Sequence, residues 1–348
     1  MLRRLSVAAA VIGTLAVPSA LQAQTKIGVS YQPALYWALP YYVATEKGWW
    51  KDVGLTPEFS VFPAGAPQVA AAQAKSWDVG GAGSVPAVLG AARFGLLTIG
   101  ITNDESKANV MMVRGDKFAA VKADPKSLKG QRILLTANST GDYAVRNCLT
   151  KYGVAFNDVQ FVNLGQAQII TAISSNNGDV VGVWAPNNYT LEEKTGAKTL
   201  CTGADAGAIV PGALLVRADY AKEQPKNVAA YLATYLRGWG WIKQNPKEAR
   251  AMMKKFYAQG GVDISDAAMD QEFAQRPVFL LDEQLKIMDR AKGASEVDRW
   301  LTDIGKFMVE TGTLPQAPDV KTFVTDEYMK LVTADPKLKA FATEFDGK

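Results

Sequence analysis

Short apolar runs alternate with helical patterns in the first part of the chain. Runs at 26–30, 55–62 and 78–83 are short, apolar and flanked by turn residues, which is typical of buried strands. A helical pattern follows each run, and Gly48 stands where the first of these helices should end. This order predicts a βαβαβ unit with a mainly parallel sheet.

The same alternation returns later in the chain. Runs at 132–136, 159–164 and 179–184 predict three more strands, each again followed by a helical pattern. The tetrapeptide WDVG at 77–80 is matched by GDVV at 178–181. We therefore predict two structurally analogous units, each with its own sheet.

Further apolar runs connect the two units. Runs at 96–103 and 109–114 separate them and predict the first connection, and the stretch 207–220 predicts a strand that returns to the first lobe. From residue 225 onward the pattern is helical. The helices expected there are 225–244, 246–257, 265–275, 282–310 and 319–333.

The prediction is an α/β protein of two mainly parallel-sheet lobes, joined by a two-strand hinge and completed by a helical C-terminal part. The first lobe would comprise residues 24–113 and 214–348, and the second lobe residues 114–213. A chain of 348 residues fits this division, because single cores stop growing beyond about 250–300 residues.

Six loops follow predicted strands and lead into helices. They are 31–37, 63–68, 81–86, 137–143, 163–168 and 184–189. Right-handed crossovers place such loops at one edge of a sheet, where open α/β sheets bind ligands. Free N–H groups at helix N-termini suit an anion. Two lobes with these edges facing each other would form a ligand cleft.

Small and hydroxyl residues in these loops would let a ligand approach the backbone. They include Gly65, Gly83, Ser84, Ser139, Thr140 and Gly141, and Asn138 lies among them. For the hydroxyl and amide side chains, ordinary helix capping stays open as the alternative.

Aromatic residues lie in or beside the same loops. They are Tyr31, Tyr36, Trp37, Tyr143, Trp184 and Tyr189. Their rings could stack on the organic part of a ligand, and core packing is the alternative.

Charged residues are scarce in the six loops. Asp142 is the main one, and we expect it to complement a helix dipole. Asp104 and Glu105 near the first connection could meet an ammonium group, but surface exposure is the expectation. The loops contain no Arg or Lys, so a bidentate clamp on a carboxylate is not evident.

The composition narrows the chemistry. The chain has no histidine, which excludes Ser-His-Asp and Cys-His catalysis and histidine-ligated metals. Catalysis by carboxylates or lysine stays possible. The net charge of +4 gives no reason to expect nucleic acid as a partner.

Residues 1–23 have the pattern of a secretory signal peptide. A basic start with Arg3 and Arg4 precedes an apolar run and small residues, and this run is too short to span a membrane. We expect export, by either the general or the twin-arginine route, and no direct insertion into the membrane. The two cysteines, Cys148 and Cys201, could pair in an oxidising compartment or stay free and buried.

Several phrases resemble one family. The opening IGVSYQPALYWALPYYVATEKGWWKDVGL, with its KGWWKDVGL phrase at 47–55, is similar to that of the nitrate/sulfonate/taurine-type periplasmic solute-binding proteins of ABC importers. Further similar pieces are AGAPQ, WDVGGAGSVPAVLGA, LKGQRILL and GDVVGVWAP, so the resemblance covers nearly the whole chain after residue 23.

The resemblance implies a type II periplasmic binding fold, a periplasmic location and delivery of ligand to a membrane permease. Together with the loop analysis, it predicts a ligand site without metal or cofactor. Its residues would be Tyr31, Gln32, Trp37, Ala64, Gly65, Ser84, Asn138, Thr140, Tyr143 and Trp184.

The expected function is non-catalytic capture of a small organic ligand by a monomer. An anionic or zwitterionic ligand such as a sulfonate, taurine or a carboxylate is the first expectation, and a nitrogenous or pyrimidine-like ligand is the alternative. A carboxylate-dependent exported enzyme and a sensory module are the other hypotheses. Family relatives that synthesise pyrimidines need histidines, which argues against that activity here.

Overall fold

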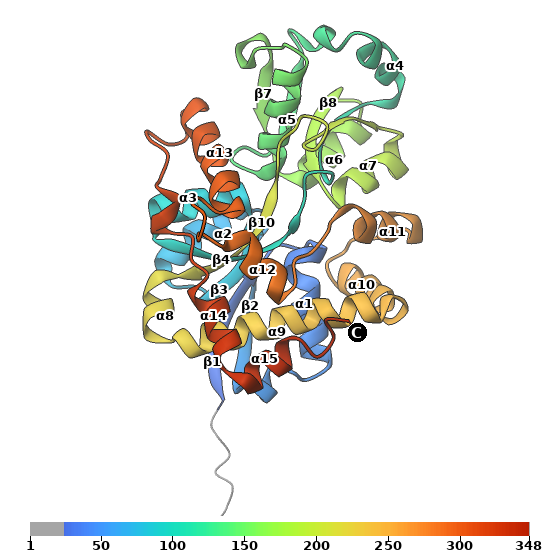
Figure 1. Cartoon of the computed structure of the whole chain (residues 1–348). Coiled ribbons are helices and arrows are strands. Elements are labelled where there is room, and N and C mark those ends of the chain that lie inside the picture. The colour runs from blue at the N-terminus through green and yellow to red at the C-terminus, as the bar shows by residue number, and fades with distance from the viewer. Residues whose placement is uncertain (1–23, 348) are drawn as a thin grey trace, which may run out of the picture.

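The computed structural model describes residues 24–347, which form two lobes that each contain a five-stranded sheet (Figure 1). The predicted signal peptide at 1–23 lies outside the described residues. The first sheet has the order β2-β1-β3-β10-β4 and the second the order β7-β6-β8-β5-β9. The strands of the first sheet are β1 Thr25–Tyr31, β2 Leu55–Val61, β3 Val79–Gly83, β4 Leu96–Asp104 and β10 Pro211–Arg217. Those of the second are β5 Asn109–Val113, β6 Arg132–Leu135, β7 Gln160–Asn163, β8 Val180–Trp184 and β9 Lys198–Thr202.

One strand in each sheet runs against the others. β10 is antiparallel to β3 and β4, and β5 is antiparallel to β8 and β9, whereas β2, β1 and β3 and likewise β7, β6 and β8 are parallel. The prediction of two mainly parallel sheets is therefore confirmed. β5 hydrogen-bonds within the second sheet, although the predicted boundary at residue 113 assigned it to the first lobe.

Helices cover both faces of each sheet. In the first part of the chain they are α1 Leu35–Glu46, η1 Lys51–Val53, α2 Gly65–Ala71, η2 Ala72–Ala74 and α3 Ser84–Phe94. In the second lobe they are α4 Gly115–Ala123, η3 Pro125–Leu128, α5 Thr140–Lys151, η4 Phe156–Asp158, α6 Gln166–Ser174 and α7 Asn187–Thr195. The C-terminal part contains α8 Ala218–Glu223, α9 Pro225–Gln244, α10 Pro246–Gln259, α11 Asp266–Gln275, α12 Leu281–Met288, α13 Glu296–Glu310, η5 Val320–Thr322, α14 Glu327–Ala334 and α15 Pro336–Ala342.

The helix predicted at 282–310 is wrong, because the chain breaks it into α12 and α13. Ser295 accepts a hydrogen bond from the N–H of Asp298, and the Asp298 carboxylate accepts one from the N–H of Ser295. This capping box starts a new helix. Gly293, with φ of +115°, makes the preceding turn, a conformation that favours glycine.

The first sheet is sandwiched between two apolar cores. One core joins the sheet to α1, α9 and α10, and the other joins it to α3 and α13. The apolar stripe expected near residues 297–308 belongs to this second core, with Val297, Leu301, Ile304 and Met308 buried. Figure 1 shows the C-terminal helices around the lower lobe, with α13 and α11 reaching toward the upper one.

Cys148 and Cys201 form a disulfide bond. The bond ties α5 to β9 within the second lobe. It resolves the alternatives of paired and free cysteines in favour of pairing.

Across residues 24–347 no helix combines the length and the apolar character that crossing a bilayer requires.

Candidate functional site

The strand-end loops of the two lobes meet face to face. A Cβ atom built on Gly83, at the end of β3, would lie 2.6 Å from Cγ2 of Thr140, at the start of α5. Ser84 and Thr140 are both buried at this junction. The contact brings the loops 81–86 and 137–143 together between the lobes, as predicted.

A buried amide network fixes the first-lobe side of this junction. Gln32 Nε2 donates to Gln68 Oε1 at 3.0 Å, and Gln68 Nε2 donates to Ser30 Oγ and to the Gly81 carbonyl, each at 3.0 Å. The network holds the loop 31–37 and the helix α2 beside β3. Gln32 thus serves packing within the first lobe.

Ala64 and Gly65 belong to the same wall. Ala64 is the half-buried residue that precedes α2. A Cβ on Gly65 would lie 2.3 Å from Cγ of Pro86, so only glycine fits this close approach. These two residues position the loop 63–68 against the start of α3.

Three enclosed polar groups have no protein partner. Trp37 Nε1, Ser84 Oγ and Asn188 Oδ1 are buried without a hydrogen-bond partner among residues 24–347. Buried polar groups in native proteins are paired in the great majority of cases. Unpaired groups on loops from both lobes are therefore candidates to bind a ligand.

Arg276 lies where the loops 31–37 and 184–189 converge. It is 2% exposed, and its Nη2 donates to the Ala185 carbonyl at 3.3 Å. Its guanidinium carbon lies 4.9 Å from the centre of the Tyr36 ring. Its Nη1 lies 3.1 Å from Oε2 of Glu272, while its Nε and Nη1 have no well-aligned acceptor in the described chain.

Two buried carboxylates act electrostatically on this guanidinium, and Glu272 is the one that pairs with it. Glu105 and Glu272 are both fully buried. Burial raises the pKa of Glu105 to about 7, against the opposing charge of Arg276 and a hydrogen bond from Asn109. Burial likewise raises the pKa of Glu272, and the positive charge of Arg276 acts to lower it. Burial disfavours the charged form of Arg276, but the two carboxylates keep its pKa above the ordinary value.

The sequence did not predict this cluster. Glu105 was expected at the surface, which is wrong, because the connection between β4 and β5 carries it inside the molecule, where it is fully buried. No cation was expected near the loops, yet Arg276 enters from the C-terminal part. The signal in the sequence is the four-residue spacing of Glu272 and Arg276 at a helix end, which places them on one face.

Trp184 ends β8 and is 5% exposed. A Cβ on Gly141 would lie 3.3 Å from its ring, so Trp184 packs under the N-terminus of α5. It stands at the start of the loop that also carries Asn188, one of the unpaired groups. Trp184 therefore forms part of the second-lobe wall.

Three predicted site residues lie elsewhere. Tyr143 packs on Phe307 of α13 with ring centres 4.9 Å apart. Asn138 Oδ1 accepts a hydrogen bond from Thr313 Oγ1 at 2.8 Å. Tyr31 packs half-buried at the rim of the first sheet, with the Phe59 ring 6.0 Å away. None of the contacts of these three residues joins them to Arg276 or Ser84.

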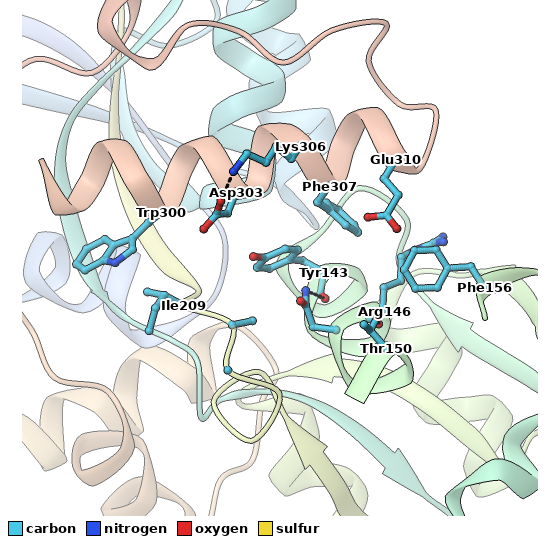
Figure 2. Close-up of a pocket in the computed structure, with 13 residues that line it drawn as sticks. Tyr143, Arg146, Thr150, Phe156, Ile209, Trp300, Asp303, Lys306, Phe307 and Glu310 are labelled. Atoms are coloured by element: carbon cyan, nitrogen blue, oxygen red, sulfur yellow. Dashed lines mark hydrogen bonds and ion pairs between the residues drawn. The ribbon is translucent and has the colours of Figure 1, made fainter. Parts of the chain in front are cut away.

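Tyr143 lines a pocket between the lobes, with a volume of about 290 Å³. Figure 2 shows Tyr143 and Arg146 of α5 facing Lys306 and Phe307 of α13 across it. Two of the cations at this pocket are paired within their own helices: Arg146 Nε donates to Asp142 at 2.7 Å, and Lys306 bonds Asp303 at 2.9 Å. The unpaired groups near Arg276 therefore form the better candidate site.

Asp142 has the expected local role. Its N–H donates to Ser139 Oγ, which caps α5, and its carboxylate accepts from the Asn138 N–H at 3.2 Å and pairs with Arg146. A carboxylate in the first turn also complements the helix dipole. Nothing in its contacts directs it toward the interlobe junction.

Within the described part of the chain, no group of three or more Cys, Asp or Glu side chains is arranged to hold a metal ion.

Comparisons with known proteins identify the family of this chain and relatives named as binding proteins. The family model described as NMT1/THI5 like matches residues 19–249. An aliphatic sulfonates-binding protein of Bacillus subtilis (strain 168) is 26% identical over 84% of this chain and 84% of its own length. The taurine-binding periplasmic protein of Escherichia coli (strain K12) is 25% identical over 89% of this chain and 95% of its own.

A similar solved structure identifies the fold of this chain. The alkanesulfonate-binding protein SsuA from Xanthomonas axonopodis pv. citri, bound to MOPS, superposes with a TM-score of 0.73 at 21% identity, covering 87% of this chain and 99% of that one. The chain therefore has the periplasmic-binding-protein fold that the sequence resemblance implied.

Proposed function

The chain belongs to the NMT1/THI5-like family, and from this premise we propose that it is the solute-binding component of an ABC importer. It captures a small organic ligand between its two lobes and delivers it to a membrane permease. The single observation that carries the proposal is the junction of strand-end loops from both lobes, where Trp37, Ser84 and Asn188 present buried, unpaired polar groups. A ligand held there would contact both lobes at once and favour their closure.

We infer that the ligand is anionic or zwitterionic, of the size of a small sulfonate or carboxylate. Relatives named for binding aliphatic sulfonates and taurine support this class. The Nε of Arg276, which has no partner among residues 24–347, supports it as well, because guanidinium N–H groups suit an oxyanion. A pyrimidine-like ligand is the alternative, since Trp37 and Trp184 offer flat apolar surfaces.

The proposal places the protein in the periplasm as a monomer, with the first 23 residues as its signal peptide. The periplasmic relative supports this location. We further propose that the lobes divide at 105–108 and 203–210, where the chain crosses between the sheets. The first crossing leads from β4 of the first sheet to β5 of the second, and the second crossing leads from β9 of the second sheet back to β10 of the first.

Catalysis is the competing hypothesis, and one observation favours it. Two buried carboxylates, Glu105 and Glu272, feel the charge of one guanidinium, and burial raises the pKa of Glu105 to about 7. A general acid or base works best with such a pKa. NMR with purified protein would detect turnover of the bound compound. Turnover would show that the function is catalysis and not binding alone.

The test is ligand-induced thermal stabilisation against sulfonates, carboxylates, amino acids and pyrimidines. A compound present at 100 times its Kd adds about 2.7 kcal/mol to the unfolding free energy and raises Tm. The Ser84→Ala variant should bind the hit more weakly, whereas Ser127→Ala, an exposed serine in η3, should not. Failure of every compound to raise Tm, or equal binding by both variants, would contradict the proposed site.

A further inference from the structure

An aromatic pocket on the flank of the first lobe is lined by none of the unpaired groups of the interlobe junction. It has a volume of about 410 Å³, and residues of β1, β2, α1 and α10 and of the segments that follow β1 and α10 line it. Pockets for small molecules have volumes of about 300–1,000 Å³, so this one is large enough for a small organic molecule. We call it the flank pocket, and its six rings are those of Tyr31, Tyr41, Tyr42, Phe59, Phe256 and Tyr257.

The strand register explains why apolar side chains gather in the flank pocket. Parallel pairing sets Tyr31 of β1 opposite Val61 of β2, and side chains two residues apart on a strand project from the same face. Tyr31, Phe59 and Val61 therefore share one face of the sheet. The ring of Tyr41 on α1 lies 6.4 Å from that of Phe59, and the ring of Phe256 on α10 lies 6.4 Å from that of Tyr31.

The cover over this face is incomplete at its edge. β2 is the outermost strand of the first sheet, and Phe59 is 39% exposed and Val61 56% exposed. Single exposed apolar residues are common, but apolar residues that gather at one place on a surface mark a site of interaction. The flank pocket therefore offers both apolar surface and access from solvent.

Two helices end at the flank pocket. Glu46 is the last residue of α1 and Gln259 is the last residue of α10, and both line the pocket. The C-terminus of a helix carries a partial negative charge, which favours a cation nearby. Neither helix has a basic residue in its last turn. Lys47, which follows α1, pairs instead with Glu248.

Glu46 adds a full negative charge to these partial ones. Among residues 24–347 it is the only charged residue that lines the flank pocket, and it forms no ion pair there. It acts on the neighbouring ring, since burial raises the pKa of Tyr42 and the charge of Glu46 raises it further. A ring face is itself negative. The charges around the flank pocket thus all favour a cation.

The chain supplies no cation to these rings. Elsewhere in the first lobe, aromatic groups pack against a cation of the protein itself. The guanidinium carbon of Arg237 lies 4.5 Å from the centre of the Trp49 ring, and Lys47 Nζ lies 4.4 Å from that of Trp241. In the described chain, no Lys or Arg side chain lies over any of the six rings of the flank pocket.

We propose that the flank pocket is a second ligand site, which binds an organic cation with an apolar body, of the class of alkylated ammonium ions. The apolar groups of the ion cover Phe59 and Val61, and its charge lies against the ring faces. Glu46 and the two helix C-termini compensate that charge. The site is separate from the interlobe junction, and its occupation does not depend on the function proposed for that junction.

The experiment is isothermal titration with choline and with 3,3-dimethylbutan-1-ol, an alcohol of the same shape that has carbon in place of the charged nitrogen. The wild type should bind choline about two- to thirtyfold more tightly than the alcohol, the range that cation–ring attraction predicts. Phenyltrimethylammonium, which has a larger apolar body, should bind more tightly than choline.

Two variants locate the cation. Glu46→Gln keeps the size of the side chain but removes its charge, and it should weaken choline binding about two- to fivefold while leaving the alcohol unaffected. Phe59→Leu keeps an apolar side chain but removes a ring, and it should reduce the preference for choline over the alcohol. Glu223→Gln, which changes an exposed carboxylate of α8, should alter neither affinity. The Tm of each variant checks that it is folded.

Equal affinity of the wild type for choline and the alcohol would overturn the inference, and so would binding of neither. Unchanged choline affinity in both Glu46→Gln and Phe59→Leu would mean that the cation binds elsewhere and would overturn it too. Each of these results leaves the proposed function standing, because Trp37, Ser84 and Asn188 do not line the flank pocket.

Discussion

At the scale of single residues, the interlobe junction leaves no room between Gly83 and Thr140. Gly83 has an ordinary extended backbone, so alanine is compatible with its conformation. The space is the constraint, because a Cβ there would approach the Thr140 methyl group to 2.6 Å. The two residues belong to different lobes, so a clash between them acts on lobe closure.

Gly83→Ala should therefore weaken ligand binding more than it weakens folding. Overpacking costs about 1–3 kcal/mol, which corresponds to a loss of affinity of about five- to 150-fold. Thr140→Ser removes the clashing methyl group and should restore affinity in the double variant. Titration of the best ligand measures the effect. Unchanged affinity in Gly83→Ala would mean that this contact is not required for binding.

Glu105 should also make stability depend on pH. Its pKa is raised from 4.5 to about 7 in the folded protein, so the folded state holds the proton more tightly than the unfolded state. The stabilising effect of that proton is present below about pH 4.5 and is lost as the pH rises through about 7.

Glu105→Gln should match the wild type in unfolding free energy at about pH 5 and exceed it at about pH 8. The difference should be about 3 kcal/mol at most, because one pKa unit corresponds to about 1.4 kcal/mol. Urea unfolding of both proteins at the two pH values measures it. A constant difference between them would show that Glu105 keeps an ordinary pKa.

At the scale of elements, the disulfide ties a site-forming helix to the edge of its sheet. α5 begins with Thr140 at the interlobe junction, and the bond from Cys148 on this helix to Cys201 on β9 closes a separation of 53 residues. Both cysteines are fully buried. The bond therefore holds α5 against the second sheet in addition to apolar packing.

Replacing both cysteines by alanine should lower the unfolding free energy by about 4 kcal/mol, as chain-entropy arguments for a loop of this length predict. Urea unfolding with and without reductant measures the change. Reductant should shift the wild type toward the double variant and leave the variant unchanged. Equal stability of oxidised wild type and variant would contradict a stabilising bond.

Local sequence signals predicted where helices and strands begin and end better than they predicted which elements pair in space. α9 runs over Pro225–Gln244 as expected, since proline marks the first turn of a helix. The break between α12 and α13 needed the capping box at Ser295. β5 joins the second sheet through hydrogen bonds with β8 and β9, and no local pattern encodes that choice.

The residues of the candidate site likewise divide into those that local signals predicted and those that they did not. Ser84, Thr140 and Trp184 were predicted because strand-end loops in parallel sheets converge at one edge. Arg276 and Glu272 were missed because they reach the junction from a helix more than 80 residues further along the chain than Ala185. Tyr143 was expected at the ligand, and its ring packs on Phe307, a contact with the C-terminal part that the sequence did not predict.

At the scale of the whole molecule, the C-terminal helices contact the second lobe on two sides. Beside α7, Ser265 Oγ donates to Glu193, and Tyr189 Oη lies 3.5 Å from Gln275 Oε1. Beside α5, the Phe307 ring meets Tyr143. The two contacts lie on different helices, α11 and α13, which Figure 1 shows on opposite sides of the upper lobe. They join the lobes in addition to the chain crossings.

The ring contact between α13 and α5 should therefore favour the closed molecule. Tyr143 and Phe307 pack edge to face with ring centres 4.9 Å apart, and such pairs contribute about 0.5–1.5 kcal/mol beyond burial. Phe307→Leu keeps an apolar side chain in the core but removes the ring. It should weaken ligand affinity about two- to tenfold, the change that this energy corresponds to, and raise the radius of gyration of the free protein. Tyr143→Phe keeps both rings and should change neither quantity. Small-angle scattering measures the radius of gyration, and titration measures the affinity. If the contact only stabilised the first lobe, Phe307→Leu would lower Tm but would leave the affinity and the radius of gyration unchanged.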